Sequence, residues 1–146
     1  MKPYDGLKVL IVDDERDYCE ATGKMLQWHG FEVYKAYGAA EAFHQLENVV
    51  PQLILLDVMM PEIDGLTILQ QLAPKPKWLG TRIVMVSAKV APEDRSAAWM
   101  SGADAYLGKP FTSDELLSAI DHALAIEASD IASDGVHSGS PSPLPG

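Results

Sequence analysis

Short apolar runs alternate along this chain with segments whose apolar residues recur at helical spacing. A run of about four to eight apolar residues is typical of a buried strand, whereas the helical period is typical of a helix that packs on one face. The pattern predicts five strands, at residues 8–12, 31–36, 53–56, 83–86 and 105–107. The second run alternates its apolar residues with Glu32 and Lys35, which favours a less buried strand at the edge of a sheet.

A helix is predicted after each strand, around residues 18–26, 41–46, 64–72, 92–100 and 112–124. Residues that are common at the ends of helices mark where several of these helices begin or stop. Gly30 can stop the first helix, Asp64 can cap the third, and Pro92 suits the first turn of the fourth. Thr112 and Glu115 have the spacing of a capping box, in which each side chain satisfies a backbone N–H group of the other residue.

The alternation of strands and helices predicts an α/β fold. Near-continuous apolar strands indicate a parallel sheet that is covered by helices on both faces, which is a doubly wound sheet. In such sheets, ligands bind outside the carboxyl ends of the strands, near the switch in strand order. The fold therefore predicts where a functional site would lie before any chemistry is considered.

The repeating pattern stops at about residue 126. Residues 127–146 are rich in Ser, Pro and Gly, and they lack the apolar content that would order them. The length of 146 residues is typical of one domain, which can bury a core without disulfides. We expect one folded domain over residues 5–126, followed by a disordered tail or linker over residues 127–146.

Polar residues follow four of the five predicted strands. Asp13 and Asp14 follow the first, Asp57 the third, Ser87 the fourth, and Lys109 comes shortly after the fifth. Because the carboxyl ends of parallel strands meet at one edge, we expect these side chains to lie together. Each has an ordinary explanation alone, since Asp14 can cap the helix that follows and Lys109 can be a surface charge. Their coincidence indicates a site.

The three aspartates would repel one another in one pocket. Either some of their pKa values rise, or a cation neutralises them. A site of oxygen ligands suits Mg²⁺, which shares its coordination shell with water and phosphate oxygens. Lys109 and Ser87 would bind phosphoryl oxygens while a carboxylate acts as the nucleophile. These residues predict phosphoryl transfer through an aspartyl phosphate.

Charge and composition limit the kinds of partner and the cellular location that are expected. The formal net charge of -10 argues against nucleic-acid binding through this chain and favours cationic partners, including divalent metals. The single Cys19 fits a reducing compartment. No apolar run approaches the roughly 20 residues of a membrane span, and the N-terminus has no apolar stretch of signal-peptide length. We expect a cytoplasmic protein without membrane contact.

These residues together resemble the receiver domain of two-component response regulators. The resemblance is carried by Asp13-Asp14, by the segment from Asp57 to Gly65, by Ser87-Ala88 and by Lys109-Pro110-Phe111. It extends over roughly residues 7–124. It implies a CheY-like, flavodoxin-like fold, with five helices and a five-stranded parallel sheet in the order 2-1-3-4-5.

The resemblance also implies a role for each site residue. Asp57 would accept a phosphoryl group, and Ser87 and Lys109 would bind its oxygens. The resemblance implies Mg²⁺ ligands from Asp14, Asp57 and the backbone carbonyl of Met59, with Asp13 reaching the ion through water. Nothing in the sequence marks a receiver that cannot be phosphorylated.

A conformational switch and a set of partners are implied as well. Tyr106 matches an aromatic residue that turns inward as Ser87 moves toward the phosphate, and the Lys109–Pro110 peptide would be cis. The phosphoryl donor would be a phosphohistidine on a histidine kinase or a histidine phosphotransfer protein. The helix at 92–100, the fifth strand and the fifth helix would then bind an output protein or domain, and phosphorylation would permit a homodimer. Such a domain is not an enzyme beyond its own phosphoryl transfer and slow self-dephosphorylation.

Three other hypotheses differ in what they require. The domain would be one module of a larger regulator or hybrid kinase if residues 127–146 lead to an output module. A Mg²⁺-dependent phosphatase with an aspartate nucleophile typically carries a second Asp two residues later, where this chain has Met59. A flavodoxin-like electron carrier would need a phosphate-binding loop after the first strand, where Asp13 and Asp14 would repel the FMN phosphate.

Overall fold

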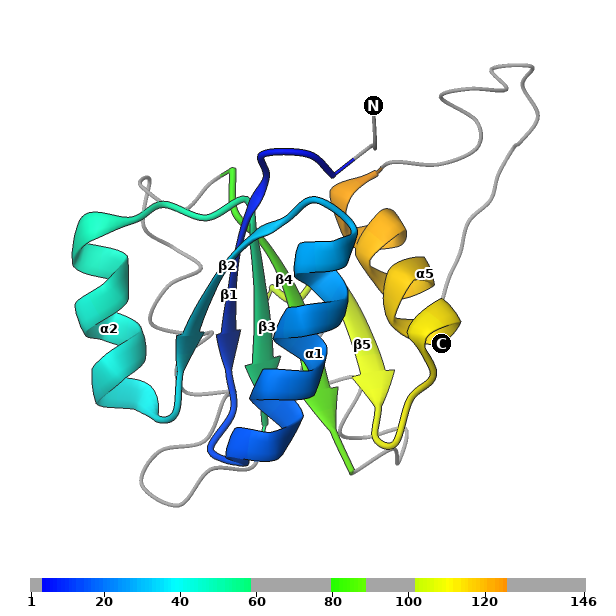
Figure 1. The fold of residues 1–146 in the computed structure, drawn as a ribbon, viewed down its shortest axis with the longest axis horizontal. Helices are drawn as coiled ribbons and strands as arrows, with labels where there is room; N and C mark the ends of the chain where they lie inside the picture. The colour runs from blue at the N-terminus through cyan, green and yellow to red at the C-terminus, as the bar shows by residue number, and fades with distance from the viewer. Residues whose placement is uncertain (1–3, 59–79, 89–101, 126–146) are drawn as a thin grey trace.

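A computed structural model describes residues 4–58, 80–88 and 102–125 of the chain (Figure 1). The strands are β1 (Lys8–Val12), β2 (Glu32–Ala36), β3 (Leu53–Asp57), β4 (Arg82–Ser87) and β5 (Ala105–Gly108), and the helices are α1 (Arg16–Trp28), α2 (Ala39–Asn48) and α5 (Ser113–Leu124). All five predicted strands are confirmed, and so are the first, second and fifth helices. The helices predicted at 64–72 and 92–100 and the tail predicted at 127–146 lie outside the described residues.

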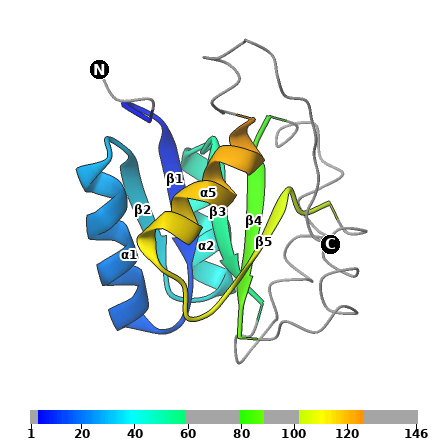
Figure 2. The ribbon, with the colours of Figure 1, turned by 90° about the vertical axis from the view of Figure 1, so that its right-hand side faces the viewer.

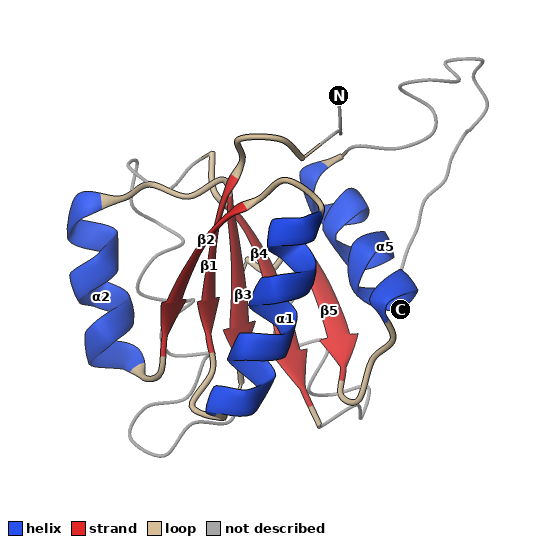
Figure 3. Cartoon of the chain, in the orientation of Figure 1, coloured by secondary structure: helices blue, strands red, loops and turns tan. Residues whose placement is uncertain are grey.

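The strands form one parallel sheet in the order β2-β1-β3-β4-β5, which confirms the predicted α/β fold class and strand order. All of them point toward the same edge (Figure 3). The order reverses at β1, because β2 lies on one side of it and β3 on the other. The carboxyl ends of β1 and β3 therefore lie beside each other at the switch point, where α/β sheets bind ligands.

Helices cover both faces of the sheet (Figures 1 and 2). The α1 and α5 side chains Cys19, Leu26, Leu116 and Ile120 pack on one face, against strand residues such as Ile11 and Leu55. On the other face α2 contributes Ala42 and Leu46, which pack against residues such as Leu10 and Leu56. The central strands are buried on both faces, and β2 is only partly buried, as expected for an edge strand.

Two predicted helix ends are confirmed in detail. The capping box of α5 is present, with Glu115 N–H donating to Thr112 Oγ1 at 3.1 Å and Thr112 N–H donating to Glu115 Oε1 at 2.9 Å. Gly30 follows α1 with φ +104°, a conformation that L side chains rarely adopt, and a Cβ at this position would collide with Asp5.

Tyr4 packs the N-terminal segment against the hydrophobic core. The sequence pattern did not indicate this contact. The ring is buried and stacks on Phe31, with the centroids 5.0 Å apart. Its hydroxyl donates a hydrogen bond to Asp121 on α5. Burial raises the pKa of Tyr4, and the hydrogen bond to Asp121 and the charge of that carboxylate raise it further.

We expect Tyr4→Ala to lower the free energy of unfolding by about 3 kcal/mol, because it removes a stacked, buried ring. Urea denaturation of the variant and the parent at neutral pH measures the difference. Tyr4→Phe keeps the ring and is expected to cost only about 1 kcal/mol for the lost hydrogen bond. Equal stability of the alanine and phenylalanine variants would contradict the stacking argument.

The same hydroxyl has an expected pH dependence. Because the folded-state pKa lies above the ordinary value of 10.0, the contribution of Tyr4 is fully present below about pH 10 and is lost as the pH rises through the raised value. The stability difference between the parent and Tyr4→Phe should therefore shrink in strongly alkaline buffer.

Candidate functional site

Three aspartates meet at the carboxyl ends of β1 and β3. The pairing of Val12 with Leu56 places the next residue of each segment, Asp13 and Asp57, side by side. One carboxylate oxygen each from Asp13, Asp14 and Asp57 lies within 4.8 Å of the others. Asp13 and Asp57 are buried, whereas Asp14 is exposed. The structure therefore brings together the three carboxylates that the sequence placed at this edge.

Lys109 reaches the same edge from the loop after β5. Its backbone N–H donates to the Ser87 carbonyl at 2.8 Å, beside the pairing of Ser87 with Gly108 at the ends of β4 and β5. Its Nζ donates to Asp13 Oδ2 at 2.8 Å and lies 3.8 Å from Asp57 Oδ2. The Lys109–Pro110 peptide is cis, as the resemblance implied.

The charges around Lys109 control its ionisation. Burial alone would lower the pKa of Lys109, but hydrogen bonds to Asp13 and Glu15 and the charges of Asp57 and Asp13 outweigh it, so the pKa is raised. Lys109 therefore stays an ammonium at neutral pH and offsets one of the carboxylate charges. The remaining negative charge favours a cation at this edge.

Ser87 and Tyr106 lie on the strands next to the aspartates. The pairing of Asp57 with Val86 puts Ser87 one residue beyond Asp57 at the same edge, and its side chain is fully buried. Tyr106 on β5 is half-buried and packs against the hydrophobic cluster that contains Met85. Met59, whose backbone carbonyl was implied as a metal ligand, lies outside the described residues.

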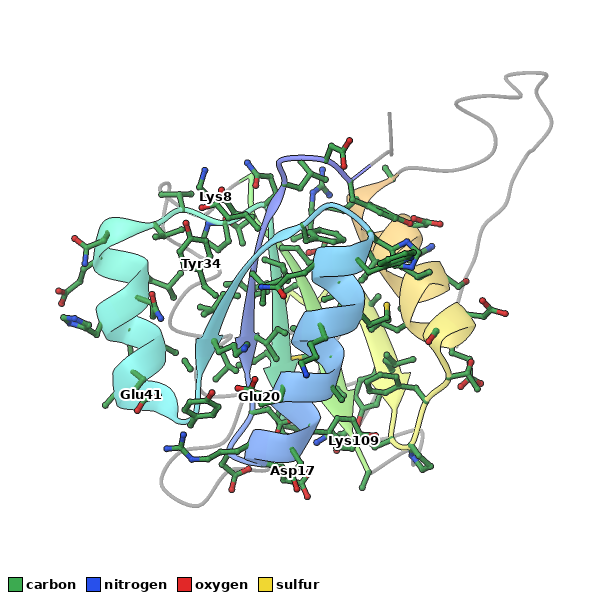
Figure 4. The ribbon with its side chains drawn as sticks, in the orientation of Figure 1. Lys8, Asp17, Glu20, Tyr34, Glu41 and Lys109 are labelled. Atoms are coloured by element: carbon green, nitrogen blue, oxygen red, sulfur yellow. The ribbon has the colours of Figure 1, made fainter. Side chains whose placement is uncertain are left out.

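Two residues of the site were missed from the sequence. Glu15, the N-cap residue of α1, accepts a hydrogen bond from Lys109 Nζ at 3.0 Å, and its own N–H donates to Asp13 Oδ1 at 2.9 Å. Tyr18, on the first turn of α1, places its ring centroid 4.2 Å from Lys109 Nζ. Figure 4 shows Lys109 beside this turn, where Asp17 is labelled. The only signal for Glu15 was that it directly follows Asp13-Asp14.

Asp14 does not occupy the cap position of α1, because Glu15 does. The capping explanation for Asp14 is therefore wrong, and its carboxylate is exposed beside those of Asp13 and Asp57. The buried Cys19 donates through Sγ to the Asp13 carbonyl oxygen at 3.3 Å. Burial and the charge of Asp13 raise the pKa of this thiol to about 12, so it supplies no thiolate to the site at neutral pH.

The donor set fits a hard divalent cation. Three carboxylates within 4.8 Å of one another provide the oxygen ligands that Mg²⁺ prefers. Asp13 is held by hydrogen bonds from Glu15 N–H and Lys109 Nζ, and Asp57 lies 3.8 Å from the same ammonium. Asp14 is exposed, so a cation held here would be accessible to water.

Comparison with known proteins gives a consistent result. A family model of the response regulator receiver domain matches residues 9–121. The chain is 34% identical to response regulator Rre1 of Synechocystis over 122 residues, covering 83% of this chain and 53% of Rre1. It is 32% identical to protein PilG of Pseudomonas aeruginosa over 116 residues, covering 80% of this chain and 86% of PilG. Response regulator MprA of Mycobacterium avium is 36% identical over 112 residues, covering 77% of this chain and 48% of MprA. The chain thus spans about half the length of Rre1 and MprA.

Solved structures show the same likeness. A CheY-like receiver domain protein from Methanospirillum hungatei aligns with a TM-score of 0.74 and 30% identity, covering 83% of this chain and 95% of that one. Chemotaxis protein CheY4 of Vibrio cholerae aligns with a TM-score of 0.77 and 28% identity, covering 82% of this chain and 99% of that one. Within the part of the chain that the structure describes, every helix is too short or too polar to span a bilayer.

Proposed function

This chain belongs to the response regulator receiver family, and we propose that it is a phosphorylation-activated switch whose phosphoacceptor is Asp57. The observation that supports this most strongly is the shared ammonium of Lys109. It bonds to Asp13 at 2.8 Å and lies 3.8 Å from Asp57 at the switch point of the sheet. A buried carboxylate beside a fixed cation is suited to becoming an acyl phosphate.

The chemical step is a transfer from nitrogen to oxygen. An Asp57 carboxylate oxygen attacks the phosphorus of a phosphohistidine, an O–P bond forms, the P–N bond breaks, and the imidazole leaves with the electron pair. Lys109 stabilises the charge on the phosphoryl oxygens, and the Ser87 hydroxyl donates a hydrogen bond to one of them. Asp13 holds Lys109 in place through their 2.8 Å hydrogen bond.

Mg²⁺ would be held by Asp14 and Asp57, with Asp13 bonding through water and the Met59 carbonyl as a further ligand. When bound, the ion supplies positive charge that offsets the carboxylates and the transferred phosphoryl group. The fit is supported by three carboxylate oxygens within 4.8 Å.

We expect Mg²⁺ to stabilise the folded protein and Asp14→Asn to remove most of that effect. At about 100 times its dissociation constant, a ligand that binds only the folded state adds about 2.7 kcal/mol to the free energy of unfolding. Urea denaturation with Mg²⁺ and with EDTA measures this for the parent and the variant. In EDTA the variant should be at least as stable as the parent, because one of three like charges is gone.

Asp17→Asn is the matched control for the metal experiment, because it neutralises an exposed carboxylate of the first turn of α1 outside the cluster. It should keep the stabilisation by Mg²⁺. A full Mg²⁺ effect in Asp14→Asn would argue against Asp14 as a ligand.

We propose that the phosphate acts on the face formed by the helix predicted at 92–100, β5 and α5, with Tyr106 as the switch residue. The half-buried position of Tyr106 on β5 supports this. The phosphoryl donor would be a histidine kinase or a histidine phosphotransfer protein. The partner that binds the phosphorylated face would be an output protein or domain. The same proposal includes a homodimer that forms on phosphorylation and a cytoplasmic location. It also includes no enzymatic activity beyond the domain's own phosphorylation and slow self-dephosphorylation.

Two architectures are compatible with a receiver domain over residues 5–126. The chain covers 86% of PilG but about half of Rre1 and MprA. Residues 127–146 are either the tail of a stand-alone receiver or the linker to an output module of a larger regulator. The codon that follows Gly146 in the native gene distinguishes the two.

Incubation with a small phosphodonor and Mg²⁺ tests the function itself. A receiver gains the mass of one phosphoryl group and keeps it long enough for detection by intact-protein mass spectrometry. An aspartate-nucleophile phosphatase would instead turn over many phosphate esters without retaining the group. Repeated turnover without a stable mass gain would overturn the proposal.

A further inference from the structure

The N-cap residue and the first turn of α1 contact Lys109 at two points. Lys109 Nζ bonds to Glu15 Oε1 at 3.0 Å and lies 4.2 Å from the centroid of the Tyr18 ring. Tyr18 also packs edgewise on Phe111, with the ring centroids 5.4 Å apart. The loop that carries Lys109 is therefore fixed against α1 on both sides of Pro110.

The ammonium of Lys109 is shared unequally among the carboxylates. Its distances to Asp13 and Glu15, 2.8 and 3.0 Å, are those of hydrogen bonds, whereas 3.8 Å to Asp57 is too long for one. Asp57, the proposed phosphoacceptor, is thus the most distant of these three partners. A phosphoryl group on Asp57 would attract the ammonium away from Glu15, to which it is bonded at 3.0 Å.

We propose that Glu15 competes with the phosphoryl group for Lys109 and thereby restrains phosphorylation of Asp57. Glu15 is a positioning residue, since it acts through Lys109. The inference rests on the proposed function and specifies how the same site is regulated. If the Lys109–Glu15 hydrogen bond breaks so that Lys109 can bind a phosphoryl oxygen, its loss makes the free energy of phosphorylation less favourable.

The charge of Glu15 acts in the same direction as its hydrogen bond. The Glu15 and Asp57 carboxylate oxygens lie 3.0 and 3.8 Å from the same atom, Lys109 Nζ. The separation of these two oxygens is therefore less than the Debye length of about 8 Å at physiological ionic strength. An anion at Glu15 therefore repels an anion bound at Asp57. Because the Glu15 side chain is 62% exposed, water weakens this repulsion, and its removal is expected to strengthen anion binding by about threefold.

Beryllofluoride, a tetrahedral mimic of the phosphoryl group, is the probe for the test. Its dissociation constant is measured by calorimetry on the full chain in saturating Mg²⁺, for the parent, Glu15→Gln and Asp17→Asn. Glu15→Gln is expected to bind at least about threefold more tightly than the parent. Asp17→Asn removes one carboxylate from the same turn of α1 and should match the parent.

Two results would overturn the inference. One is a Glu15→Gln variant that binds beryllofluoride no more tightly than the parent. The other is an equal gain in affinity for beryllofluoride in Asp17→Asn, which would assign the effect to the total charge at this end of α1. A purely structural role of Glu15 would change the free energy of unfolding, measured in urea, without a gain in affinity.

Failure of the proposed function itself has a different signature. If the parent does not bind beryllofluoride in Mg²⁺, or if Asp57→Asn binds it as well as the parent does, Asp57 is not the phosphoacceptor. The inference about Glu15 is then wrong as well.

Discussion

Replacing Asp57 with asparagine is expected to abolish phosphorylation by a small phosphodonor in the presence of Mg²⁺. The amide cannot attack phosphorus, so the acyl phosphate cannot form. Asp13, the nearest buried alternative, has one oxygen bonded to Lys109 at 2.8 Å and the other to Glu15 N–H at 2.9 Å. We therefore expect no second carboxylate to take over, and the mass gain seen in the parent should be absent.

The loss should not come from unfolding. Asparagine has nearly the size of aspartate and removes one of three like charges, so the variant is expected to be at least as stable as the parent in metal-free buffer. Urea denaturation checks this. Asp114→Asn, on the exposed first turn of α5, is a control that should be phosphorylated like the parent. A hydroxylamine-sensitive mass gain that persists in Asp57→Asn would place the phosphoacceptor elsewhere.

The sequence predicted the three central strands well because their burial is nearly continuous. The run Leu53–Leu56 is buried at every position, and the runs that became β1 and β4 are almost as apolar. Helix ends were harder to predict. The second helix was placed at 41–46, whereas α2 spans Ala39–Asn48. Its N-cap is Gly38, which has no side chain with which to cap, so the composition there carried no start signal.

The candidate site was predictable as far as the backbone determines it. Once β1 and β3 are neighbours, Asp13 and Asp57 must meet, and the pairing of β4 with β5 brings Lys109 to the same edge.

Contacts between distant side chains could not be predicted in this way. Glu15 and Lys109 are 94 positions apart, and the helical period of α1 shows which face is buried but not which side chain a turn contacts. Tyr18 was therefore predicted only as a helix-face residue. Tyr4 was missed because residues 1–6 have no periodic pattern that indicates packing.

Ser87→Ala is expected to leave phosphorylation of Asp57 largely intact and to weaken the conformational response. Alanine keeps the backbone bond from Lys109 N–H to the residue 87 carbonyl, which is 2.8 Å in the parent, and removes only the hydroxyl. Moving a two-state equilibrium from 1:99 to 99:1 needs about 5.5 kcal/mol, and one charge-assisted hydrogen bond contributes roughly 1.5–3 kcal/mol. Its loss should reduce the equilibrium constant of the activated state by about 10- to 150-fold.

Two separate measurements distinguish the chemical step from the switch. Mass spectrometry follows the phosphorylated fraction, which should be similar in the parent and in Ser87→Ala. Amide NMR shifts of β5 and α5 follow the response, and their phosphorylation-linked changes should be much smaller in the variant. Ser87→Thr retains the hydroxyl and should restore them. Equal shifts in the parent and Ser87→Ala would mean that Lys109 and the phosphate drive the switch without the hydroxyl of the fully buried Ser87.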